Sequence, residues 1–193
     1  LKTVELENFS KSLTSPILFT YKNTQRKILA MHLYDKRLNY TEDNDYQVLE
    51  LDYENRVLAM GFMLPKKNVL PKMTEQQFGR YVDKLSPTYI DIVQIPRFMH
   101  EGRYKLNGLL QQMGISKLFQ NADLTDLTTN KTKVSSIMHH CAIIVDEGDD
   151  SNQQARNKPE ISGMNTMFLA KHPFIYYLRY KPLNLLMVIG IHQ

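Results

Sequence analysis

Residues 137–150 read IMHHCAIIVDEGDD and residues 168–174 read FLAKHPF, with a long polar segment between them. The first stretch begins as an apolar strand, from Ile137 to Val145, and passes into an acidic hinge that contains one glycine. Connections of this length without secondary structure are usually functional or disordered in a compact domain. The region from Val134 to Phe174 is therefore the first place to look for function.

The composition is that of a globular chain with a substantial core. The 193 residues are 42% hydrophobic and 23% charged, which suits one domain or part of a larger one. The net charge of +4 reflects 24 basic against 20 acidic residues spread along the chain. Such a small excess predicts no nucleic-acid partner, and the basic pairs at Arg26, Lys36 and Lys66 are interpreted as solvated surface. No apolar run approaches the roughly 18 residues that cross a bilayer, so no membrane segment is predicted.

The single cysteine, Cys141, cannot close an internal disulfide. The chain opens at Leu1 without an initiator methionine, which is typical of a processed or trimmed product. Three Asn-X-Ser/Thr triplets begin at Asn8, Asn39 and Asn130 and would carry N-linked glycans in a secretory protein. We therefore expect a secreted, extracellular glycoprotein.

Strand patterns dominate after the first forty residues. In YQVLELDY, residues 46–53, apolar side chains alternate with polar ones, which predicts a strand with one buried face. In VLAMGFML, residues 57–64, both faces are apolar, which predicts a fully covered strand that ends at Pro65. A turn at residues 54–56 would join the two strands as a hairpin.

Two short helices and further strands are also predicted. Thr74 and Gln77 have the spacing of a capping box before an amphipathic helix that ends near Leu85. Leu106, Leu109, Leu110 and Met113 share one helical face, and Gly114 is placed to cap that helix. Strands are predicted over residues 89–95, and residues 174–180 and 185–191 should form an antiparallel pair.

Several segments, taken in order, resemble the serpin family. These are YQVLELDYENRVLAMGFMLPKK (46–67), VQIPRF (93–98), YKLNGLLQQMGISKLF (104–119), ADLTDL (122–127), IIVDEG (143–148), FLAKHPFIYYLR (168–179) and MVIGI (187–191). The resemblance implies an α+β fold of mostly antiparallel sheets, a few short helices and an exposed reactive loop. Residues 1–193 would be the C-terminal portion of one larger serpin-like domain, and residues 147–167 would be the loop region. A companion chain or segment would supply the N-terminal half.

The resemblance also implies a function as an inhibitor, without enzymatic activity, cofactor or metal. Serpins offer the reactive loop to a serine protease as bait. After the protease forms an acyl-enzyme, the loop inserts into a sheet and distorts the protease before the ester hydrolyses. The partner would therefore be a serine protease.

The hinge departs from the family pattern. Glu147 matches the hinge glutamate, but Gly148 comes one residue early, and Asp149 or Asp150 stands where the family has a small residue. An unpaired carboxylate that enters a sheet costs on the order of several kcal/mol, whereas each new strand hydrogen bond contributes only about 1 kcal/mol. We therefore expect weak trapping. The alternative is a non-inhibitory serpin that acts as a protein-binding scaffold.

Three positions compete as the reactive bond. Counting forward from Glu147 gives Ser162 and Gly163, and counting back from FLAKHPF gives residues 159–161. Arg156 followed by Asn157 is chemically attractive because a trypsin-like pocket selects a long cation, but this pair lies close to the hinge. A solvated loop residue remains the alternative interpretation of Arg156.

His139 lies where the family often has a gating histidine beneath the hinge. It also lies two residues before Cys141, so a thiol–imidazole hydrolase is a distant third hypothesis, although a buried structural histidine is the simpler interpretation. The acidic residues 146–150 do not fit a calcium loop, because Gly148 stands where the third ligand should be. They are interpreted as solvated hinge charge.

Overall fold

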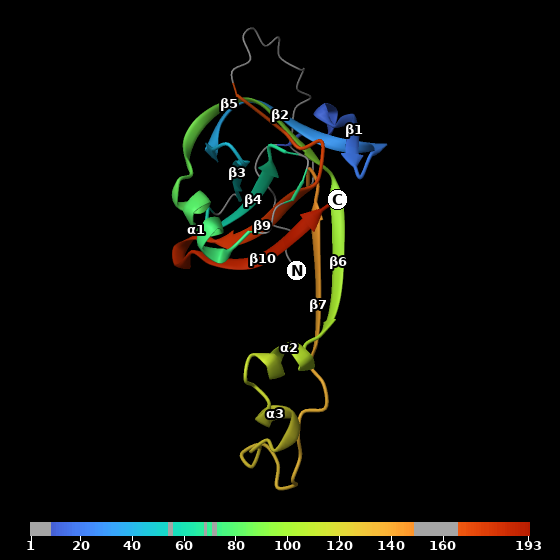
Figure 1. The fold of residues 1–193 in the computed structure, drawn as a ribbon, viewed down its shortest axis with the longest axis vertical. Helices are drawn as coiled ribbons and strands as arrows, with labels where there is room; N and C mark the ends of the chain where they lie inside the picture. Colours follow the sequence, from blue (N-terminus) through green and yellow to red (C-terminus); the bar gives the residue numbers. More distant parts are fainter. Residues whose placement is uncertain (1–8, 54–55, 68, 71–72, 149–165) are drawn as a thin grey trace. The chain divides into compact units, whose positions relative to one another are not determined.

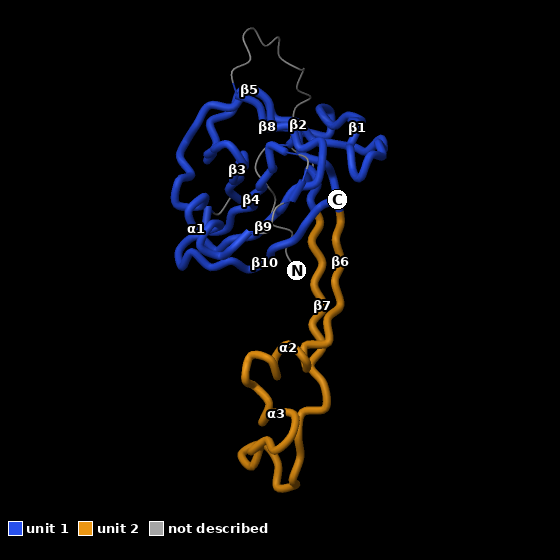
Figure 2. Tube along the Cα trace, in the orientation of Figure 1, with its two compact units in different colours: residues 1–98, 145–193 blue, residues 99–144 orange. Residues whose placement is uncertain are grey.

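A computed structural model of the chain describes residues 9–53, 56–67, 69–70, 73–148 and 166–193 (Figure 1). The chain divides into two compact units (Figure 2). The first contains residues 1–98 and 145–193, and the second contains residues 99–144. Each unit is described by itself below.

The first unit is built on one large sheet with the order β10-β9-β4-β3-β2-β5-β8, and β1 pairs with β2 beside this path. The strands are β1 (Ser15–Tyr21), β2 (Thr24–Glu42), β3 (Tyr46–Asp52), β4 (Leu58–Pro65), β5 (Ser86–Pro96), β8 (Met167–Leu169), β9 (Phe174–Tyr180) and β10 (Leu185–His192). Short 3-10 helices, η1 (Lys11–Leu13) and η2 (Lys181–Leu183), precede β1 and β10. Every pairing is antiparallel except that of β5 with β8.

The long strand β2 was not found from the sequence. It has 19 residues and pairs first with β1, across a turn in which Lys22 and Asn23 have φ values of 44° and 62°. It then pairs with β5, and its end pairs with β3. At Asp35, φ is 52°, and the pairing of β2 with β5 continues in the same register on both sides of this residue. Charged residues interrupt the period-two pattern here, which explains why the first forty residues gave little strand signal.

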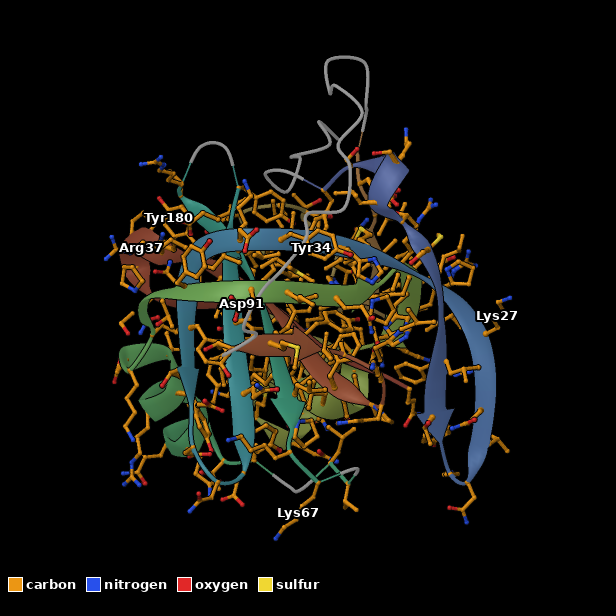
Figure 3. All side chains as sticks on the ribbon, turned by 90° about the horizontal axis from the view of Figure 1, so that it is seen from above. Lys27, Tyr34, Arg37, Lys67, Asp91 and Tyr180 are labelled. Atoms are coloured by element: carbon orange, nitrogen blue, oxygen red, sulfur yellow. The ribbon has the colours of Figure 1, made fainter. Side chains whose placement is uncertain are left out.

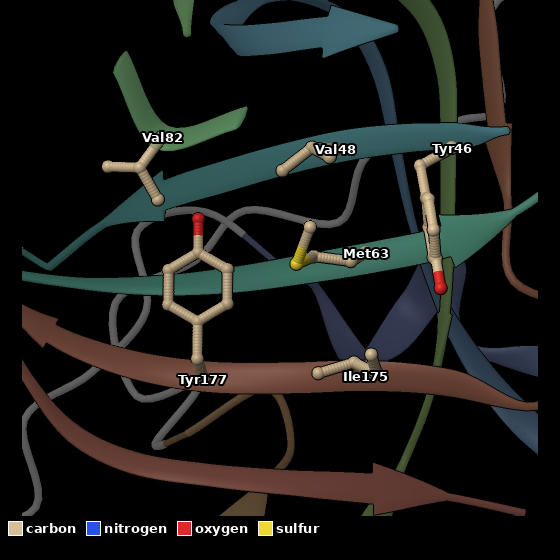
Figure 4. Packing of buried hydrophobic residues seen from close by; sticks show 6 residues of the cluster. All are labelled: Tyr46, Val48, Met63, Val82, Ile175 and Tyr177. Atoms are coloured by element: carbon tan, nitrogen blue, oxygen red, sulfur yellow. The ribbon is translucent and has the colours of Figure 1, made fainter. Parts of the chain in front are cut away.

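The predicted hairpin of β3 and β4 is confirmed, but β3 is covered on both faces. One face, with Tyr46 and Val48, packs in a cluster that includes Val82 of helix α1 (Glu75–Asp83) and Tyr177 of β9 (Figure 4). Leu49 and Leu51 of the opposite face are buried as well. The prediction of one exposed face was therefore wrong. The alternating pattern of β3 includes Glu50, a polar residue that is nevertheless buried because it forms an ion pair.

Helix α1 begins as predicted. The Thr74 hydroxyl oxygen accepts a hydrogen bond from Gln77 N, and the side-chain oxygen of Gln77 accepts one from Thr74 N, so the capping box is complete. The box satisfies two helix N–H groups that have no partner within the helix. It fixes where α1 begins and so directs Phe78 and Val82 toward the sheet.

A buried ion pair crosses the sheet beside this cluster. Both carboxylate oxygens of Glu50, which is 2% exposed, accept hydrogen bonds from Arg179, at 2.8 Å from Nε and 2.5 Å from Nη2. Gly61 of β4 lies between Glu50 and Tyr177 on the sheet and pairs with both. The Tyr177 ring lies over Gly61, and burial raises the pKa of Tyr177 well above its ordinary value.

The predicted pair of C-terminal strands is confirmed. β9 and β10 are antiparallel, and Asn184 takes the left-handed conformation in the turn between them, with φ of 49°. β10 is the end strand of the sheet order. Several of its apolar side chains are about half exposed, namely Leu185, Met187, Ile189 and Ile191.

The second unit consists of most of a two-stranded ribbon and the residues between its strands. The ribbon is formed by β6 (Phe98–Lys105) and β7 (Met138–Val145), and α2 (Asn107–Gln112) and α3 (Lys117–Gln120) lie between them in the chain. Asn107 joins the two sides, because its side chain donates to Ser135 O and accepts from Ile137 N, both at 3.0 Å. Gly114 has a φ of 90° and ends the α2 segment as predicted. None of the described helices is long and apolar enough to span a bilayer.

Candidate functional site

The candidate site is the pair of anchors that hold the two ends of the loop region 147–167. Residues 149–165 lie outside the described residues. So do the reactive-bond candidates Arg156, Asn157, Ser162 and Gly163, the hinge acids Asp149 and Asp150, and the glycosylation candidate Asn8. The structure describes the residues at the two ends of this region, and their contacts centre on Glu147 and Thr166.

The first anchor is centred on the buried side chain of Glu147, which is 3% exposed. Its Oε1 accepts a hydrogen bond from the hydroxyl of Thr14, and Arg97 Nε lies 3.2 Å from its Oε2. Oε2 accepts no hydrogen bond from the described residues, so Arg97 compensates it by charge alone. The prediction of a solvated hinge charge was therefore wrong for Glu147, because Thr14 and Arg97, both far away in the chain, provide it with partners.

Gly148 turns the chain directly after this carboxylate. Its φ is 70°, a conformation that glycine adopts at no steric cost, and its N–H donates to Asp146 Oδ1 at 3.0 Å. Asp146 therefore closes a local turn, while Glu147 faces the interior. Asp146 and Glu147 are neighbours in the hinge but have different roles, and the amino-acid composition of the hinge does not show this difference.

The second anchor joins Thr166 and β8 to β5. Thr166 N donates to Asp91 Oδ2 at 2.8 Å, and Asp91 N donates to Thr166 O at 2.9 Å. Phe168 and Ala170 are fully buried, and Ala170 N donates to Gln94 O at 2.9 Å. Asp91 lies on β5 beside strand β2, which carries Tyr34 (Figure 3). This end of the loop region is fixed by reciprocal bonds and by core packing.

The histidine and the cysteine proposed as a thiol–imidazole pair lie in the second unit and do not form a catalytic pair. His139 is exposed, and its ring lies 6.4 Å from the ring of Tyr104, so it is not the buried histidine that the sequence suggested. Cys141 is half-buried, and within residues 99–144 no hydrogen bond joins it to His139. The neighbouring His140 instead lies 2.7 Å from Glu101 and is the main cause of the lowered pKa of that carboxyl.

The remaining sequence candidates differ in accessibility. Asn39 is half-buried in β2 and is paired with Glu50 on one side and Pro87 on the other. Asn130 is exposed in the second unit. Across the part of the chain that the structure describes, no group of three His, Cys, Asp or Glu residues could hold a metal ion.

Sequence reasoning missed Thr14, Arg97 and Asp91. Arg97 stands in the quoted motif VQIPRF, but nothing local showed that its partner would be Glu147. A charged residue directly after the buried strand β5 was the one available signal.

The sequence profile described as "Serpin (serine protease inhibitor)" matches residues 4–192. The chain belongs to the serpin family. An uncharacterized serpin-like protein of Acanthamoeba polyphaga mimivirus is 26% identical over 192 residues, which cover 90% of this chain and 47% of the relative. The leukocyte elastase inhibitor of Bos taurus is 27% identical over 204 residues, which cover 95% of this chain and 53% of the relative.

The fold agrees with this assignment. The crystal structure of the thermophilic serpin Tengpin in the native state matches with a TM-score of 0.75 and 22% identity, over 97% of this chain and 52% of that one. The chain thus spans about half the length of the relatives it matches. The predicted fold class, a serpin-like α+β arrangement of mostly antiparallel strands, is confirmed.

Proposed function

We propose that this chain is the loop-bearing portion of a serpin-type inhibitor and that residues 147–167 present bait to a serine protease. The observation that carries the proposal is the pair of buried anchors at Glu147 and Thr166. A bait segment must be held at both ends. A protease can then bind and cut the segment while both new chain ends stay attached to the inhibitor. A relative of known name, the bovine leukocyte elastase inhibitor, supports the inhibitor class.

We further propose that trapping is weak. Insertion would begin with Asp149 or Asp150, and a buried carboxylate without a partner costs on the order of several kcal/mol. The cost falls on the first residues to insert and therefore slows insertion. Hydrolysis of the acyl-enzyme is then faster than insertion. Most encounters would then end in a cleaved loop rather than in a covalent complex.

Completion by a further segment is part of the proposal. The half-exposed apolar side chains of β10 favour a companion chain or segment that supplies the N-terminal half. A secreted location remains a prediction. If glycans are attached, exposed Asn130 is a better acceptor than Asn39, whose strand is paired on both sides.

The test is incubation with trypsin-like and elastase-like serine proteases, followed by denaturing electrophoresis and intact mass. We expect a cut between residues 149 and 165 and a small fraction of SDS-stable complex. Replacement of both acids, Asp149→Thr with Asp150→Thr, should increase the fraction of complex, while Asp126→Thr, at an exposed acid of the second unit, should leave it unchanged. Failure to cut this segment with any serine protease would contradict the proposal.

The same digests assign the reactive bond. A cut after Arg156 that Arg156→Ala abolishes would identify that residue as bait for a trypsin-like protease. A cut at Ser162 would support the spacing counted from Glu147. The non-inhibitory scaffold is favoured if the loop is cut and neither the natural chain nor the double variant forms any complex.

A further inference from the structure

A buried histidine lies between the two anchors. His32 on β2 is 7% exposed, and each of its ring nitrogens contacts a different segment. Nδ1 lies 3.0 Å from Leu13 O, and Nε2 lies 3.2 Å from Gln94 Oε1. The ring of Tyr34 stacks on its ring at a centroid distance of 6.1 Å.

Leu13 is covalently next to the first anchor, and Gln94 belongs to the second. Leu13 precedes Thr14, whose hydroxyl donates to Glu147 at the beginning of the loop region. Gln94 accepts a hydrogen bond from Ala170 N through its backbone carbonyl, and it pairs with Leu169 of β8 at the end of the loop region. The imidazole is thus the link in a continuous chain of contacts from Glu147 to Ala170.

The donor and acceptor roles of the ring nitrogens are compatible with hydrogen bonds from His32 to both segments. A backbone carbonyl only accepts, so Nδ1 must carry the proton that it donates to Leu13 O. In a neutral ring Nε2 then requires a donor, and the amide nitrogen of Gln94 is buried without a partner among the described residues. Rotation of this amide by half a turn lets it donate to Nε2, since amide orientation is assigned from the hydrogen-bond network. In a protonated ring both nitrogens donate, and the ring joins both segments in either state.

We propose that His32 is a positioning residue that couples the two ends of the loop region, so that loosening the Glu147 anchor also loosens β8. The meaning of this coupling for inhibition rests on the proposed function, but the coupling itself does not. Because the hinge must move when a bait loop inserts, a linked far end would respond to that movement.

The test is a double-mutant cycle read by amide hydrogen exchange of Ala170 at constant pH. Thr14→Val removes the hydroxyl that holds Glu147, and it should speed exchange at Ala170 roughly fivefold, the equivalent of one typical hydrogen bond. In a His32→Phe background, which keeps a ring of similar size, Thr14→Val should have no further effect on Ala170. The control is Thr24→Val, which removes an exposed hydroxyl bond to Tyr21 O and should leave Ala170 exchange unchanged.

Amides of the central strand β3 serve as the internal reference, because a general loss of stability would speed both sets equally. An equal effect of Thr14→Val with and without His32 would overturn the proposal, and so would no effect on Ala170 in either background. If His32→Phe does not fold, Gln94→Leu breaks one side of the link and keeps the backbone carbonyl. It should abolish the effect of Thr14→Val, and an intact effect would overturn the coupling.

No protease takes part in this experiment. Coupling without loop cleavage by any protease would remove the proposed function and leave the role of His32 in place. Loop cleavage without coupling would do the reverse.

Discussion

The two units use their apolar and charged residues differently. In the first unit, the large side chains of β3, β4 and β9 are buried, and Glu50 is paired with Arg179 inside the sheet. In the second unit, Leu109, Met113 and Leu127 are more than half exposed, and Glu101 and Arg103 pair at the surface. The first unit is therefore specified by its own packing. The second unit is specified by local signals, and its apolar side chains have little cover among the described residues.

The largest expected effect separates the two ion pairs. Arg179→Met leaves Glu50 buried without a partner and should lower the free energy of unfolding by about 3–5 kcal/mol. The same change at Arg103, whose side chain is 74% exposed, removes a screened surface pair and should leave the urea midpoint within experimental error. Equal effects at the two arginines would contradict the contrast between the units.

Glycine replacements should separate a tightly packed position from open ones. A Cβ added at Gly61 would lie 1.9 Å from Tyr177 Cζ, and the Tyr177 ring is held by Phe78 at a centroid distance of 4.8 Å. Gly61→Ala should therefore destabilise by about 1–3 kcal/mol or more.

The controls for Gly61→Ala are the same change at Gly108 of α2 and at Gly79 of α1, where a Cβ meets no atom of the described residues within 4 Å. Each should stabilise its helix by about 0.5–1 kcal/mol, measured by urea unfolding. A destabilised Gly79→Ala would show that helix packing, rather than contact with Tyr177, controls these positions.

The same contrast explains what could be predicted from the sequence. The hairpin of β3 and β4, the capping box of α1 and the pair of β9 and β10 were predictable, because each depends on neighbours within about twenty residues. Strand β2 was missed because charged residues interrupt its period-two pattern. Its extended conformation depends on pairing with β1, β3 and β5, which the sequence of β2 alone does not reveal. The apolar face of α2 was visible in the sequence, but its exposure was not, since spacing shows a face and not what covers it.

At the site, the sequence indicated where to look but not how the ends are held. Glu147 and Gly148 were identified through the family resemblance. Thr14, Arg97 and His32 were not, because each acts on the loop region through contacts between segments far apart in the chain.

A moderate effect is expected at the first anchor. Glu147→Gln removes the charge that Arg97 compensates, and it should cost about 1–2 kcal/mol, a value reduced because the Arg97 side chain is 39% exposed. Asp146→Asn keeps the oxygen that accepts from Gly148 N and should leave the urea midpoint unchanged. If the two variants unfold alike, Glu147 is not the anchoring carboxylate.

The smallest effect is a dependence on pH near the second anchor. Burial lowers the pKa of His172 below its ordinary value of 6.5, although a bond to Pro173 O opposes the shift. The unfolded chain therefore binds this proton more readily than the folded one. Stability from this source is complete above pH 6.5 and is lost as the pH falls through 6.5 toward the lower folded pKa.

His172→Gln should flatten the decrease in stability over that pH range, as measured by urea unfolding at closely spaced pH values. Parallel pH curves for the natural chain and the variant would show that His172 contributes nothing to the decrease.

The most direct test of the central claim is the position of the first cut in limited proteolysis, mapped by intact mass. If residues 147–167 are bait held at both ends, serine proteases of different specificity should all cut first between residues 149 and 165, and the two products should stay associated through the buried anchors. First cuts within residues 99–144, with the loop region still intact, would contradict the account.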